Sequence, residues 1–221
     1  MKIAKSIVPR PLIEYISYRR RAQFVRDYRS RRETEIARWI AEGKRGNPPH
    51  AVKQDYVRKY AKEFDARILV ETGTYLGQMI YAMKDDFEAL VSIELSEELH
   101  GNAVRLFKRY RNVKIVQGDS GKILLSVLEG IHQTCLFWLD GHSSEGITKK
   151  GESSTPIVGE IGFIKEHATR NGIEHVILID DARNFNGTDD YPRIDVFENL
   201  VKALFPDYAF EIHDDIIAIH K

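Results

Sequence analysis

Two groups of acidic residues follow apolar runs in the second half of the chain and have the chemistry of a metal site. Asp140 comes directly after residues 134–139, and Asp180 and Asp181 come directly after residues 175–179. If both runs are parallel strands of one sheet, their carboxyl ends meet in one crevice, where the three carboxylates repel one another. A divalent cation relieves that repulsion, and oxygen-only ligation favours Mg²⁺, Mn²⁺ or Ca²⁺ over zinc. Helix caps and solvated turn acids are the alternative.

A glycine-rich turn follows an earlier apolar run at residues 68–70 and has the character of a cofactor loop. The glycines let the backbone turn tightly, so that a cofactor can lie against it. The spacing departs from the G-x-G-x-x-G of dinucleotide folds, which disfavours an NAD(P)-dependent oxidoreductase. A carboxylate at the strand end repels a pyrophosphate but suits the cationic amino-acid moiety of S-adenosylmethionine. An ordinary strand-to-helix turn is the alternative for the predicted cofactor contacts Glu71, Thr72, Gly73, Tyr75 and Gly77.

Polar residues after the next strands extend this cofactor site. Glu94 lies about twenty residues beyond the first glycine, where an acid can hydrogen-bond both ribose hydroxyls. Asp119 is placed to accept from an adenine amino group, with a plain turn residue as its alternative, and Ser120 is placed to cap the helix that follows. Asp140 completes the predicted cofactor contacts.

Alternating strand and helix patterns must position these residues. Apolar runs predict strands and segments with helical periodicity predict helices. Ser96 is the predicted N-cap of one of these helices. The last two strands flank Asp214-Asp215 as a hairpin. The pattern predicts an α/β, Rossmann-like fold whose seven-stranded, mostly parallel sheet ends in an antiparallel hairpin. Strands are expected at 68–70, 89–93, 113–116, 134–139, 175–179, 208–213 and 216–220, and helices at 78–83, 96–110, 122–128, from 156, and at 195–204.

Five of these segments resemble, in chain order, the motifs of class I S-adenosylmethionine-dependent methyltransferases. They are the turn at 71–77, Ile93-Glu94, Gly118-Asp119-Ser120, Trp138-Leu-Asp-Gly-His142 and Ile179-Asp-Asp181. The resemblance covers roughly residues 50–221. Within the superfamily the chain is most similar to the macrocin O-methyltransferase group, whose members methylate sugar hydroxyls, typically with a bound Mg²⁺.

The resemblance implies a cofactor, a metal and a reaction. S-adenosylmethionine would be the methyl donor, and Asp140, Asp180 and Asp181 would hold the metal. His142 and Asp140 would be the catalytic residues, with His142 as the general base, although some relatives favour an aspartate in that role. A neutral imidazole is available near pH 7 to take the proton of a hydroxyl whose pKa the metal lowers. The alternative for His142 is a loop histidine that hydrogen-bonds a neighbouring backbone group. The acceptor would be a sugar or another small polyhydroxylated molecule. The chain departs from the group at Ala182-Arg183-Asn184-Phe185, directly after the second acid pair.

The first 49 residues differ in character from residues 50–221, which we assign to the S-adenosylmethionine-binding domain. Up to Arg32 the chain has ten basic and two acidic residues, whereas the remainder has 23 basic and 31 acidic ones. This basic helical extension is a cap over the cofactor cleft or a homodimer contact, a surface for anionic lipid or nucleic acid, or a solvated basic face. A non-catalytic protein that binds a membrane or nucleic acid through this arm is the alternative function.

Length and composition limit the other classes. The 221 residues, 43% of them hydrophobic, are enough for one α/β core with a helical extension. Cys135 is the only cysteine, which excludes a disulfide framework. No apolar run near the amino terminus is long enough for a signal peptide or a membrane span, so a cytoplasmic protein is expected.

Overall fold

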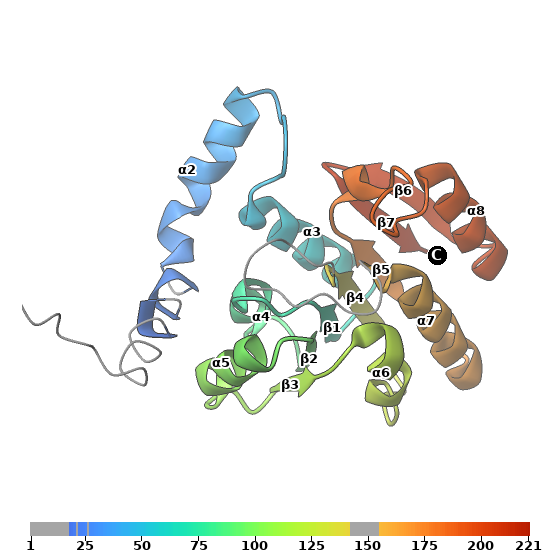
Figure 1. Ribbon diagram of the computed structural model, residues 1–221, viewed down its shortest axis with the longest axis horizontal. Helices are drawn as coiled ribbons and strands as arrows, with labels where there is room; N and C mark the ends of the chain where they lie inside the picture. Colours follow the sequence, from blue (N-terminus) through green and yellow to red (C-terminus); the bar gives the residue numbers. More distant parts are fainter. Residues whose placement is uncertain (1–17, 21, 26, 142–154) are drawn as a thin grey trace, which may run out of the picture.

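A central seven-stranded sheet organises the protein, shown as a computed structural model in Figure 1. The structure describes residues 18–20, 22–25, 27–141 and 155–221. The strand order is β3-β2-β1-β4-β5-β7-β6. The strands are β1 (Ile68–Thr72), β2 (Ala89–Glu94), β3 (Val113–Gln117), β4 (Cys135–Leu139), β5 (Val176–Ile179), β6 (Ala209–His213) and β7 (Ile216–His220).

The topology confirms the predicted Rossmann-like arrangement. Strands β1 to β5 pair in parallel, while β7 pairs antiparallel with both β5 and β6. The chain winds outward from β1 through β2 to β3, and then returns to place β4 on the other side of β1. Ligands of open α/β sheets bind at such a reversal, beyond the carboxyl ends of the strands. The fold therefore places the expected site at the ends of β1 and β4.

Helices cover both faces of the sheet, which explains why the central strands are continuous apolar runs. Successive strand residues point to opposite faces, so Leu136 and Trp138 belong to one core and Phe137 and Leu139 to the other. The first core includes residues of α3 (His50–Glu63), α4 (Gln78–Met83) and α5 (Glu97–Phe107), and the second includes residues of α6 (Ser120–Val127), α7 (Ile157–Asn171) and α8 (Ile194–Leu204).

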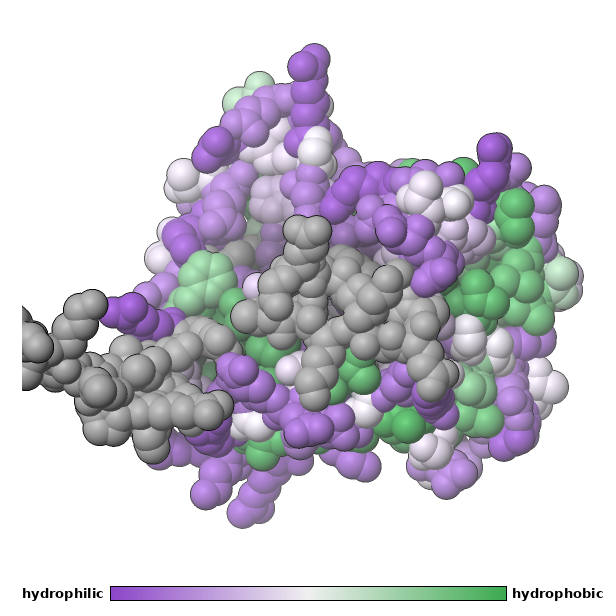
Figure 2. All heavy atoms as spheres, in the orientation of Figure 1, coloured by the Kyte–Doolittle hydropathy of each residue, from purple (hydrophilic) through white to green (hydrophobic). Residues whose placement is uncertain are grey.

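Helix α2 (Tyr28–Ala41) stands away from the sheet and meets the body through α3 (Figure 1). Its visible surface is largely hydrophilic (Figure 2). Part of its positive charge is offset within the chain, because Arg32 pairs with Asp55 of α3 and Arg38 lies 2.8 Å from Glu42. Among the described residues, no helix combines the length and the apolar character needed to cross a bilayer.

Two buried histidines lie between β4, β5 and α7. The Cys135 backbone N–H donates to His175 Nδ1 at 3.1 Å, and His175 Nε2 lies 3.0 Å from His167 Nδ1. His167 Nε2 is 3.0 Å from the carbonyl oxygen of Ile131. A carbonyl only accepts, so Nε2 of His167 carries the proton and its Nδ1 accepts from His175. Both rings are therefore neutral and fully paired.

This arrangement predicts acid sensitivity. Burial lowers the pKa of His175 to about 4, and it also lowers the pKa of His167. A depressed pKa in the folded state means that the unfolded chain binds the extra proton first, so stability is lost as pH falls from about 6.5 towards the folded value. Between pH 7 and pH 5, His175 alone should remove about 2 kcal/mol from the free energy of unfolding. Urea unfolding at the two pH values measures the loss.

His175→Gln tests the assignment, because the amide keeps an acceptor for Cys135 and a donor for His167 but does not titrate. The variant should lose less stability than the wild type over the same pH range. The exposed His213→Gln is the control and should behave like the wild type. An unchanged pH dependence in His175→Gln would contradict the prediction.

Candidate functional site at the carboxyl ends of the strands

Backbone hydrogen bonds align the ends of the four central strands. Gly73 N donates to the carbonyl oxygen of Ile93 at 2.9 Å, and Asp140 N donates to that of Thr72 at 3.0 Å. Asp180 N donates to the carbonyl of Leu139 at 3.0 Å. The residues that follow β1, β4 and β5 therefore lie along one edge of the sheet, as the sequence predicts.

The two glycines of the turn after β1 are required by the geometry. Gly73 has φ 86°, and a Cβ there would lie 2.2 Å from the carbonyl oxygen of Asp140. Gly77 has φ 78° and precedes α4, where a Cβ would lie 2.8 Å from the ring of Phe107. Only glycine combines this backbone conformation with such close contacts. The turn thus keeps bare backbone against β4 and α5.

Glu71 lies inside the sheet. The strand continues to Thr72, and Glu71 stands opposite Ser92 of β2, whose hydroxyl donates to its carboxyl group. Burial raises the pKa of Glu71 well above its usual range. Burial thus opposes the negative charge that would attract a cationic ligand, and the predicted contact of Glu71 with an amino-acid moiety stays a prediction.

Glu94 is held rigidly at the end of β2. Its Oε2 accepts from the backbone N–H of Tyr75 at 2.8 Å, and its Oε1 accepts from that of Ser96 at 2.8 Å. Burial raises the pKa of Glu94, and the two backbone donors oppose the shift. Tyr75 itself is 44% exposed beside this carboxylate. The fold thus brings the turn after β1 and the predicted ribose ligand together.

The start of α6 differs from the prediction. The helix begins at Ser120 rather than Lys122, and its N-cap is Asp119, whose side chain accepts from Gly121 N at 3.0 Å. Ser120 is therefore the first helical residue and not the cap. The cap bond occupies Oδ1 of Asp119, while its Oδ2 lies 3.9 Å from Lys122 Nζ. The predicted contact of Asp119 with adenine is not tested by this geometry.

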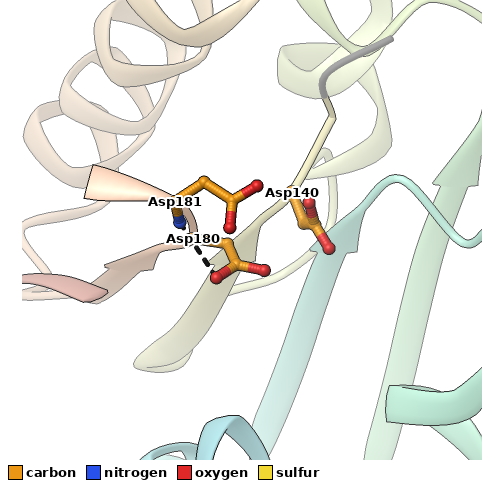
Figure 3. A group of neighbouring side chains, drawn as sticks. All are labelled: Asp140, Asp180 and Asp181. Atoms are coloured by element: carbon orange, nitrogen blue, oxygen red, sulfur yellow. Dashed lines mark hydrogen bonds between the residues drawn. The ribbon is translucent and has the colours of Figure 1, made fainter. Parts of the chain in front are cut away.

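The three predicted metal ligands are brought together (Figure 3). One carboxylate oxygen from each of Asp140, Asp180 and Asp181 lies within 4.8 Å of the others, with Asp180 and Asp181 buried and Asp140 half-buried. Asp181 has φ 58°, and its backbone N–H donates to Oδ1 of Asp180 at 2.9 Å. This local turn directs both side chains of the pair toward the end of β4.

A buried lysine of α3 reaches the same carboxylates, which the sequence analysis did not anticipate. Lys53 Nζ lies 2.5 Å from Asp180 Oδ2 and 3.7 Å from Asp181 Oδ1. Arg183 also contributes, with Nη2 2.9 Å from Asp181 Oδ1. Burial raises the pKa of Asp180, the carboxylates of Asp140 and Asp181 raise it further, and Lys53 opposes them. The cluster thus contains three acids and two cationic side chains.

Comparison with known proteins identifies the fold. No family model and no curated protein matches the chain by sequence. A SAH-bound methyltransferase from Podospora anserina matches with a TM-score of 0.53 and 16% identity over 97% of this chain and 98% of that one. An O-methyltransferase from Bacillus cereus, in complex with SAH, gives 0.55 and 15% over 87% and 91%. The chain has a methyltransferase fold. A putative caffeoyl-CoA O-methyltransferase from Staphylococcus aureus gives 0.53 and 17% over 85% and 91%.

The acidic cluster of this methyltransferase fold fits a hard divalent cation. All three donors are carboxylate oxygens, which Mg²⁺, Mn²⁺ and Ca²⁺ prefer. Oxygen ligands on opposite sides of a cation of this kind lie about 4 to 5 Å apart, and the three carboxylate oxygens lie within 4.8 Å of one another, which agrees with that spacing. His142, the predicted general base, lies outside the described residues.

Glu160 is a buried acid near the start of α7, where the sequence pattern allows either a position near the site or a solvated helix face. It is 1% exposed, and its Oε1 has no hydrogen-bond partner among the described residues, as is also true of Thr72 Oγ1. A Cβ on Gly141 would lie 3.3 Å from Glu160 Oε1 and 3.2 Å from Thr72 Oγ1. Burial raises the pKa of Glu160 to about 7. Unsatisfied polar atoms thus lie directly behind the residue that follows Asp140.

His50, at the start of α3, is the described histidine that interacts electrostatically with Asp140. Its Nδ1 lies 2.9 Å from Nε2 of Gln54, and burial with the nearby Lys53 ammonium lowers the pKa of His50 to about 4. The ring is therefore neutral at pH 7. His50, Lys53 and Gln54 lie on one face of α3, because they are spaced i, i+3 and i+4 along the helix. This spacing is the sequence signal that could have indicated that the three side chains face the same part of the site.

Proposed function

We propose that the protein is an S-adenosylmethionine-dependent O-methyltransferase acting on a hydroxyl of a sugar or another small polyhydroxylated acceptor. The observation that carries the proposal is the meeting of the glycine turn after β1, the fixed carboxylate of Glu94 and the acidic cluster at one edge of the sheet. The methyltransferase fold and the SAH-bound protein structures that share it support the choice of cofactor.

The residues divide into cofactor and acceptor groups. In the proposal, the turn from Gly73 to Gly77 lies against the amino-acid end of the cofactor and Glu94 binds the ribose hydroxyls. Asp119 and Ser120, at the start of α6, flank the adenine. Asp140, Asp180 and Asp181 would hold Mg²⁺ or a similar cation, which when bound lowers the pKa of the acceptor hydroxyl.

The reaction transfers a methyl group from sulfur to oxygen. The S–CH₃ bond of the sulfonium breaks, an O–CH₃ bond forms in line with it, and the sulfur becomes neutral. The hydroxyl proton leaves to a base, for which we propose His142. The backbone of Asp140 lies directly against Gly73, so in the proposal it keeps the acceptor end of the site close to the donor end.

Calorimetric titration with S-adenosylmethionine and with S-adenosylhomocysteine, each with and without Mg²⁺, tests the proposal directly. We expect micromolar binding of both sulfur compounds and no binding of NADH, the control ligand. Absence of binding under all conditions would remove the cofactor interpretation and leave the basic amino-terminal segment as the basis for a non-catalytic role.

Glu94→Gln should weaken binding of S-adenosylmethionine about tenfold or more, because a charged acceptor for two ribose hydroxyls is replaced by a neutral amide that also presents donors. Calorimetry with the purified variant measures the loss. Glu98→Gln, an exposed acid on the neighbouring α5, is the matched control and should bind like the wild type. Equal affinity for both variants would refute the ribose role of Glu94.

A further inference from the structure

We propose that the Lys53 ammonium is the built-in counter-ion of the Asp140, Asp180 and Asp181 cluster and competes with a divalent cation for its carboxylates. The inference rests on the metal site of the proposed function and adds a regulatory element to it. Loading of the cation is then coupled to departure of the Lys53 side chain from the cluster.

Lys53 is buried and contacts two carboxylates of the cluster. Its side chain is 9% exposed and that of Asp180 is 1% exposed, so water does not screen the pair. The ammonium donates to Asp180 Oδ2 at 2.5 Å, and its Nζ lies 3.7 Å from Asp181 Oδ1. Both are oxygens of the residues that would ligate the metal. A cation and the ammonium therefore require the same side of the cluster.

Helix α3 delivers this charge from a fixed position. Its buried residues, among them Val57 and Tyr60, belong to the first core, and its outer side is tied at two further points. Arg32 of α2 pairs with Asp55, and Tyr56 Oη donates to Asp214 Oδ2 at 3.0 Å. The ammonium is thus presented by a packed helix and not by a loop, so it stays at the cluster unless its own side chain moves.

The balance of charge explains why the competition should be measurable. Three carboxylates face the ammonium of Lys53 and the guanidinium of Arg183, and Arg183 also pairs with Asp215, so these two cations offset only part of the negative charge. A site with a lower net negative charge binds a divalent cation more weakly. Removing Lys53 restores one negative charge and frees Asp180 Oδ2, while removing the lysine of a surface ion pair elsewhere leaves the charge of the cluster unchanged.

Titration with MnCl₂ and MgCl₂ alone, without cofactor, tests the proposal in the wild type and three variants. Lys53→Met should bind Mn²⁺ at least about tenfold more tightly than the wild type. Lys53→Arg retains the charge and should bind as weakly as the wild type. Lys202→Met removes an exposed lysine of α8 that pairs with Glu198, 2.6 Å apart, and is the matched control.

Thermal unfolding supplies a second readout. Without a cation, Lys53→Met should melt below the wild type, because buried carboxylates have lost their partner. Saturating MgCl₂ should raise its melting temperature more than that of the wild type, since a ligand that binds only the folded state stabilises it. If Lys53→Met does not fold without a cation, Lys53→Gln takes its place in both measurements.

Equal or weaker Mn²⁺ affinity in Lys53→Met and Lys53→Gln would overturn the proposal, and so would the absence of binding in all proteins. Neither result depends on S-adenosylmethionine. Cofactor binding measured without metal therefore separates failure of the lysine competition from failure of the proposed methyltransferase function.

Discussion

The Gly73→Ala protein is expected to bind no measurable S-adenosylmethionine and to melt roughly 10 °C below the wild type. A side chain at φ 86° costs about 1 kcal/mol, and a Cβ placed 2.2 Å from the Asp140 carbonyl oxygen forces the end of β4 away from the turn. Overlap of this kind costs typically 1–3 kcal/mol in a packed interior. Both halves of the proposed site move, so binding and stability fall together.

Gly130→Ala is the control for this prediction. Gly130 has a similar φ of 83°, but a Cβ there would meet nothing within 4 Å. The control should therefore lose only about 1 kcal/mol of stability and should bind the cofactor normally. Calorimetry and thermal unfolding of both variants give the comparison. A Gly73→Ala protein that matches Gly130→Ala in both respects would show that the close approach of β1 and β4 does not form the cofactor site.

The second large effect is expected at Asp140, where substitution by asparagine should slow methyl transfer roughly 10³-fold. The amide retains the shape of the side chain at the end of β4 but removes the charge proposed to hold the metal. The carboxylate of Asp140 contributes to the raised pKa of Asp180, so its removal relieves a repulsion. The variant should therefore be at least as stable as the wild type.

Formation of S-adenosylhomocysteine with a hydroxylated acceptor from a screen measures the rate, and urea unfolding measures the stability. Asp207→Asn, an exposed acid before β6, is the control for the general effect of losing one carboxylate. An Asp140→Asn protein with near-normal turnover would place the chemistry elsewhere along this edge of the sheet. A variant that is inactive because it has unfolded would be recognised by its unfolding curve in urea.

The sequence predicted the architecture well because its strongest signals are local. Buried parallel strands read as apolar runs, and each of the predicted runs became a strand of the sheet. The acids after β4 and β5 were likewise brought together, since carboxyl ends of adjacent parallel strands share an edge. A single rule of topology was enough for Asp140, Asp180 and Asp181.

The parts that the sequence did not reveal depend on contacts between distant segments. Lys53 lies 127 residues from Asp180 in the chain, and a lysine in a polar helix gives no indication of burial. The position of Glu160 could not be decided for the same reason, because only the packing of α7 determines which of its polar residues faces the sheet. Glu71 was predicted at the end of its strand as a cofactor contact, whereas β1 continues to Thr72 and pairs Glu71 with Ser92 of β2.

The helix start at Ser120 shows a subtler limit. Both Asp119 and Ser120 are good N-cap residues, and a choice between adjacent candidates requires the backbone conformation. Asp119 has the extended conformation of a cap, and its side chain accepts the Gly121 N–H. Local preference therefore located the start of α6 to within two residues, but it did not show that Asp119 rather than Ser120 is the N-cap.

The turn of the carboxyl-terminal hairpin has a consequence for the order of events during synthesis. The carbonyl of Asp215 accepts from Ala182 N at 2.8 Å, its Oδ1 accepts from Arg183 N at 2.8 Å, and Asp214 accepts from Tyr56 of α3. The segment behind Asp181 and the helix that carries Lys53 are thus both fastened by residues 214 and 215. A nascent chain that has emerged only as far as the segment after β5 already contains the proposed metal ligands and Lys53. It still lacks the hydrogen bonds to residues 214 and 215 that hold these segments in place. We therefore expect ligand-competent protein to appear only after the hairpin has been translated and paired.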